Sequence, residues 1–128
     1  MMMMMMMMMI EPEVKMAFCT DIDDIDGWLP SDRKPISYWL QVDIGPKNET
    51  GADHFEIRVA SAEAMIGEMP TICRATMLVD QASYSFEQVL QTLDTVVQSC
   101  GRETCQETAV ALSRHLRWEH EDYAVIDA

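Results

Sequence analysis

The densest group of potential ligands is a run of four aspartates within six residues: Asp21, Asp23, Asp24 and Asp26. Alternating carboxylates followed by a glycine are typical of the calcium loop of an EF-hand. The register is wrong for calcium, because placing Gly27 at the sixth position puts Ile22 at the first and Arg33 at the twelfth, where oxygen ligands are required. The run therefore predicts either a solvated acidic loop or an acidic surface that docks a partner.

A second candidate site is a series of cysteines and histidines with the spacing C-x4-C-x9-H-x4-H: Cys100, Cys105, His115 and His120. The first spacing is at the long limit for zinc sites, and the middle spacing falls short of the usual ~12 residues. Helical periodicity offers another role for both thiols, because Cys100 ends one apolar stripe and Cys105 shares a stripe with Leu112. We therefore expect no metal and no cofactor.

Signatures of catalysis are also missing from the sequence, which contains neither G-x-S-x-G nor H-E-x-x-H. The glycine-containing stretch 45–51 has the wrong spacing for a phosphate loop and leads into a predicted strand instead of a helix. With three histidines and four cysteines, a Cys–His proximity would arise by chance. The sequence therefore predicts a protein that is not an enzyme.

The charge balance restricts the partners of this chain. Its 22 acidic residues against 9 lysines and arginines give a formal net charge of −13. Such a surface disfavours binding to nucleic acid or to an anionic membrane, and it favours a basic protein partner. Apart from the methionine tract, no window approaches the length of a membrane helix, and no signal peptide is recognisable. We therefore expect a cytoplasmic protein with reduced thiols.

The elements that would position these residues follow from hydrophobic periodicity. Strands are predicted where apolar and polar residues alternate, over 13–19, 38–44 and 55–59, with a further strand over 74–79. In the first of them, Val14, Met16 and Phe18 are expected to face the core. The segment 20–35 is predicted to be a loop, and 45–51 a hairpin loop.

Helices are predicted over 61–69, from Phe86 to Cys100, and from Thr104 onward. Ser85 with Gln88, and Thr104 with Glu107, have the spacing of capping boxes. We expect an α+β fold: a four-stranded antiparallel sheet with a short helix and two C-terminal helices packed on one face. Residues 1–9 are a methionine tract, interpreted as a cloning remnant or a placeholder, and 10–128 are expected to form a single domain.

Three segments resemble a known family, and they occur in the family's order: SYWLQVDIGPK at 37–47 with Glu49, Gly51, Phe55 and Val59; SCG at 99–101 with LSR at 112–114; and WEHEDY at 118–123. The chain resembles the immunity protein 8 family of bacterial polymorphic toxin systems. His120 stands where the family usually has Phe, and Cys105 where it often has Trp. The resemblance implies a small α+β antidote that binds a cognate toxin in the cytoplasm and blocks it stoichiometrically.

The acidic composition and the resemblance agree on a non-catalytic inhibitor. One candidate target is a basic nuclease, whose substrate cleft an acidic domain could occupy. The partner-binding residues expected are Asp21, Asp23, Asp24, Asp26, Trp39, Glu119, Glu121 and Asp122. Trp39 lies on the polar face of its strand, so it either meets the helices or forms an exposed patch. Trp118 and Tyr123 are expected mainly to pack in the core. The alternative is an acidic regulatory or structural module that binds another basic protein.

Overall fold

Two long neighbouring strands form the centre of the sheet, where the alternation of apolar residues is strongest. The computed structural model describes residues 9–30, 34–66 and 75–119. In it, β3 (Ser37–Pro46) pairs antiparallel with β4 (Asp53–Ser61), and β2 (Pro12–Phe18) pairs antiparallel with β3. Seven core side chains of β3 and β4 point to one face of the sheet: Tyr38, Leu40, Val42, Ile44, Phe55, Ile57 and Val59.

The other edge of β4 is shared by two short strands. β5 (Thr76–Val79) pairs with residues 58–61 of β4, and β6 (Arg117–Trp118) pairs with residues 55–56. The pairing of β4 with β5 is parallel, so the expectation of a purely antiparallel sheet of four strands is wrong in this detail. A parallel neighbour needs a crossover connection, and the chain between β4 and β5, which begins with α1 (Ala62–Ile66), supplies it.

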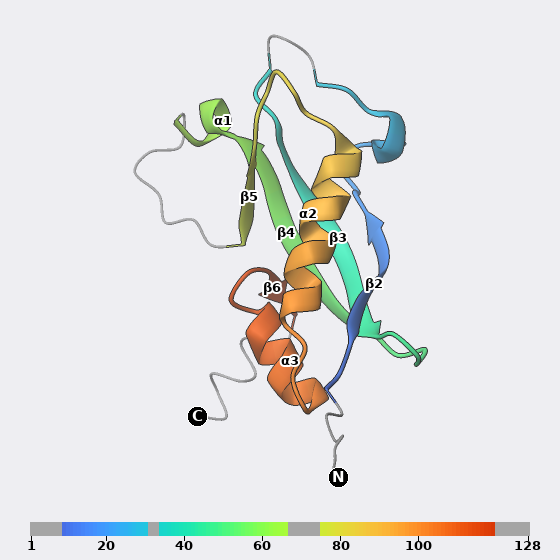
Figure 1. The fold of residues 1–128 in the computed structure, drawn as a ribbon. Coiled ribbons are helices and arrows are strands. Elements are labelled where there is room, and N and C mark those ends of the chain that lie inside the picture. The colour runs from blue at the N-terminus through green and yellow to red at the C-terminus, as the bar shows by residue number, and fades with distance from the viewer. Residues whose placement is uncertain (1–8, 31–33, 67–74, 120–128) are drawn as a thin grey trace.

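Helices cover the apolar face of the sheet. α2 (Phe86–Ser99) runs across β3 and β4, and α3 (Cys105–Leu112) follows it near one end of the sheet (Figure 1). α2 buries the stripe that the sequence predicts, with Phe86, Val89, Leu93 and Val97 inside. Both predicted N-caps are present: the Ser85 side chain accepts from the Gln88 N–H, and Thr104 accepts from the Glu107 N–H. The expected α+β class is thus confirmed.

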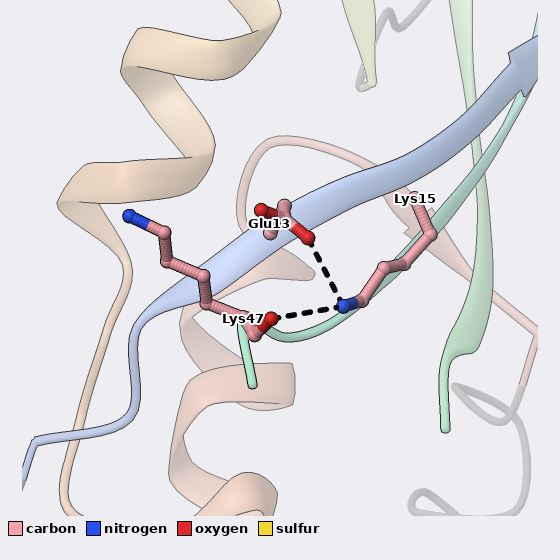
Figure 2. Close-up of polar contacts among 3 residues, drawn as sticks. All are labelled: Glu13, Lys15 and Lys47. Carbon is pink, nitrogen blue, oxygen red and sulfur yellow. Dashed lines mark hydrogen bonds and ion pairs between the residues drawn. The ribbon is translucent and has the colours of Figure 1, made fainter. Parts of the chain in front are cut away.

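A β-bulge changes the side-chain pattern of β2. The pairing with β3 shifts between Val14 and Met16, so Lys15 is an extra residue in the strand. The Lys15 ammonium donates to Glu13 Oε1 at 3.0 Å and to the carbonyl oxygen of Lys47 at 3.4 Å, which ties the bulge to the turn after β3 (Figure 2).

The bulge overturns part of the predicted core. Because side chains alternate with a period of two, one extra residue exchanges the faces of everything beyond it. Val14 packs against the core as expected, but Met16 and Phe18 are exposed, and Ala17 and Cys19 pack inward instead. The prediction that Met16 and Phe18 face the core was therefore wrong.

Candidate partner-binding surface

The acidic run after β2 is held in place by its apolar residues. Ile25 is buried in the core, and Ile22 packs against it. The segment Ile25–Gly27 is a single 3-10 turn, η1, that lies beside the start of α2 (Figure 1). All four carboxylate residues are exposed: Asp21, Asp23, Asp24 and Asp26. We call these four residues the acidic loop.

The backbone of Asp24 fixes the turn. Its φ of 53° and ψ of 54° lie in the left-handed region, which aspartate and asparagine tolerate better than most residues. The carbonyl oxygen of Asp24 accepts a hydrogen bond from the Gly27 N–H at 3.1 Å. The acidic loop is therefore a defined turn that Ile22 and Ile25 attach to the core, and its carboxylate residues are exposed.

Three aromatic rings anchor the end of this loop. Trp28 packs edge-on against Tyr38 and Tyr84, with ring centroids 5.8 and 5.4 Å away. The hydroxyl oxygens of Tyr38 and Tyr84 lie 2.8 Å apart within hydrogen-bonding distance. Burial is the main cause that raises the pKa of both phenols, so they stay neutral and form a structural cluster.

The second feature is the face of the sheet that points away from α2 and α3. Trp39 lies on this face with 36% of its surface exposed, which settles its position between the two alternatives: it does not meet the helices. Met16, Phe18 and Leu78 are exposed on the same face, as their strand pairings require. Met16 and Phe18 could not be found from simple alternation, because the signal that redirects them is the bulge.

Charged and polar groups on this face are paired with one another. His54 Nδ1 contacts Asp43 Oδ1, Arg117 forms an ion pair with Glu56 at 3.2 Å, and Gln41 donates to Glu56. The hydrogen bond that His54 donates to the Asp43 carboxylate, followed by the negative charge of that carboxylate, raises the pKa of His54. The Arg58 guanidinium donates twice to Ser37.

Glu119, another of the expected residues, lies nearer the end of the sheet that carries the β3–β4 hairpin. The backbone N–H of Glu119 donates to the carbonyl oxygen of His54, whereas the acidic loop follows Phe18, which pairs with Gln41. Glu119 is exposed, but it does not share a cluster with the acidic loop. Glu121 and Asp122, like Tyr123, lie outside the described residues.

Trp118 has the structural role that was favoured for it. Its ring stacks on Phe55, with centroids 6.3 Å apart and an interplanar angle of 19°, and it packs against the core. Trp118 and Phe55 are also directly paired across β6 and β4. The closing motif of the chain thus begins with a side chain that completes the core.

Cys100 and Cys105 differ in burial, although both were expected to be buried. Cys100 is buried at the end of α2, as predicted, but Cys105 is exposed in the first turn of α3, so its predicted burial was wrong. Cys105 lines a hollow of about 220 Å³ between α3 and the β3–β4 hairpin, together with Ala109 and Leu112. Within the described ranges, no three Cys, His, Asp or Glu side chains are grouped so that they could hold a metal ion.

The fold and this surface define a class of protein: a small α+β binding domain with one helix-covered sheet face, one open face and an exposed acidic loop. The chain belongs to the immunity protein 8 family, whose family model matches residues 12–123. Membership implies an immunity protein of a toxin system, with a cognate toxin as its partner. Searches of curated proteins and of solved structures found no match. Among the described residues, no helix has the length and hydropathy needed to cross a membrane.

Proposed function

We propose that this protein neutralises its cognate toxin by binding it tightly and stoichiometrically, with no chemical step of its own. The observation that carries this proposal is the family match over residues 12–123. The open sheet face and the exposed acidic loop provide surface for a protein partner. The complex would form in the cytoplasm, where a toxin that reaches the cell would act.

The charge of the chain supports a basic partner surface, such as the substrate cleft of a nuclease. A net charge of −13 attracts a basic toxin, and such steering raises association rates above the unassisted ~10⁵ to 10⁶ M⁻¹s⁻¹. In this proposal the acidic loop guides the encounter and Trp39 contributes contact area. Glu119, Glu121 and Asp122 would contribute a second acidic region nearer the C-terminus.

Co-expression with the toxin domain encoded beside this gene tests the proposal. The wild-type chain should rescue growth, and calorimetry with a catalytically inactivated toxin domain should give one immunity protein per toxin. A variant with a disrupted core, Leu40→Asp, provides the matched negative control, because Leu40 is fully buried. Protection at far below one equivalent, with chemically altered toxin recovered, would instead reveal an enzyme. Rescue without any binding would also contradict direct blocking.

A further inference from the structure

We infer that the open sheet face around Met16, Phe18 and Trp39 is the water-excluded centre of the toxin interface, and that its partner surface is apolar with a basic border. We call these three residues the open-face patch. The inference rests on the proposed function, and it adds which face binds and what chemistry the partner must present.

The open-face patch consists of large apolar side chains that are exposed to solvent. Met16, Phe18 and Trp39 are 56%, 41% and 36% exposed. Met16 and Phe18 alternate on β2, so they point to the same side of the sheet. Phe18 pairs with Gln41, two residues from Trp39 on β3, and such diagonal neighbours are ~7 to 8 Å apart, within reach of aromatic rings. The three side chains therefore form one patch across two strands.

The charged residues beside the patch are paired with one another, which lowers the cost of removing water from this face. Asp43 pairs with His54, and Glu56 pairs with Arg117, so these carboxylates have partners on the same face. Interface centres are depleted of uncompensated charge and enriched in aromatic residues and methionine. On a chain with a net charge of −13, an apolar patch beside paired charges has the character of an interface centre.

The acidic loop lies at one edge of this surface. It begins at Asp21, three residues after Phe18, and continues toward the start of α2, so its carboxylates lie beside the patch at the end of β2 and not on the open face itself. The partner must therefore match an apolar centre and a negative rim, which requires an apolar area flanked by lysine or arginine. A second copy of this chain does not fit, because it would bring another charge of −13 and another acidic loop to the same contact.

Paired substitutions test the inference. Phe18→Thr and Trp39→Thr remove apolar area from the open-face patch, and Val110→Thr removes it from the outer side of α3, where Val110 is 44% exposed. The probe is the purified, inactivated toxin domain encoded beside this gene. Each open-face variant should weaken binding at least tenfold, mainly through faster dissociation, whereas Val110→Thr should change it less than twofold.

A measurement on the wild-type chain removes any dependence on how the variants fold. Hydroxyl-radical footprinting should show Met16, Phe18 and Trp39 protected when the toxin domain binds, and Val110 unchanged. Tight binding without protection of the patch would overturn the inference and leave the proposed function standing. The same holds if Phe18→Thr, Trp39→Thr and Val110→Thr all bind the toxin domain with equal affinity. Absence of both binding and rescue by the wild-type chain would overturn both. A wild-type dimer in sedimentation, broken by Trp39→Thr, would assign the patch to self-association and overturn the inference alone.

Discussion

The backbone at Gly45 approaches Gly51 so closely that a Cβ atom on Gly45 would lie 2.0 Å from the carbonyl oxygen of Gly51. The same atom would lie 3.1 Å from the Cα of Ala52. Gly45 is buried in β3, where the chain enters the hairpin. The glycine of the IGPK motif is therefore a packing requirement of this turn.

Gly45→Ala should destabilise the fold by about 1 to 3 kcal/mol or more, because the added methyl group meets backbone that cannot rotate away. Gly51→Ala is the matched control, since nothing lies within 4 Å of its added Cβ. The control should change the free energy of unfolding by no more than about 0.5 kcal/mol. Urea denaturation measures both, and equal effects would contradict the close approach.

The two leucines of α2 should differ in their contribution to stability. Leu93 is almost fully buried, whereas Leu90 is half-buried at the margin of the core. Leu93→Ala should cost about 2 to 5 kcal/mol, and Leu90→Ala should cost less, because a partly exposed site leaves a smaller cavity. Thermal or urea unfolding of the two variants tests this order. A larger loss for Leu90 would mean that α2 is rotated relative to the sheet.

The hydrogen bond between Tyr38 and Tyr84 should show strong coupling. Tyr84→Phe removes the partner of the buried Tyr38 hydroxyl and should cost about 1 to 3 kcal/mol. The double variant with Phe at both positions should lose less than the sum of the single losses, since no hydroxyl is then left behind. Additive losses in the double-mutant cycle would show that the two hydroxyls do not interact.

The pair of His54 and Asp43 should give a small pH dependence of stability. Asp43 raises the pKa of His54 above its ordinary value of about 6.5. The stabilising contribution should therefore be fully present below about pH 6.5 and disappear as the pH rises through the raised pKa. Because His54 is exposed, added salt should weaken the effect.

An NMR titration of the His54 ring checks this expectation directly. Asp43→Asn should lower the pKa of His54 toward its ordinary value, because it removes the charge that favours the imidazolium. Asp43→Asn should also remove the pH dependence of the free energy of unfolding that this pair causes. His54→Gln should remove the same pH dependence. An unchanged pKa in Asp43→Asn would show that this contact does not set the titration.

The acidic loop should act on association more than on dissociation. Asp23→Lys with Asp26→Lys should slow binding to the toxin domain about threefold to tenfold at low salt and flatten its salt dependence. Asp24 is left unchanged because of its left-handed backbone. The control double variant, Glu49→Lys with Glu103→Lys, changes the net charge equally at other exposed sites and should slow association less. Stopped-flow measurements give the association rates. If both double variants slow association equally, the acidic loop contributes only through the net charge.

The parts of the fold that sequence could predict are those set by local periodicity. The stripe of α2 and the caps at Ser85 and Thr104 depend on residues within a few positions of each other. The direction of β5 could not be predicted, because four residues carry no information about which way the strand runs. β6 could not be predicted either, since its two residues are ordered by pairing with β4.

The candidate surface was only partly visible in the sequence for a related reason. The acidic loop could be found from composition, because isolated carboxylates almost always face water. The open-face patch could not, because an alternating segment containing Val14, Met16 and Phe18 predicts one shared face unless a bulge is known. Cys105 was misplaced because α3 is short, and its first turn extends beyond the packed part of the helix.

Both edges of the described sheet bear on how this protein behaves at high concentration. Exposed, regular edge strands recruit other chains and lead to aggregation. Here β2 carries a bulge with a lysine at its centre, and the opposite side of β4 is divided between two short strands that run in opposite directions. Neither edge offers a long regular ladder to a neighbouring molecule. We therefore expect that neither edge of the described sheet adds strands from neighbouring molecules when the free protein accumulates.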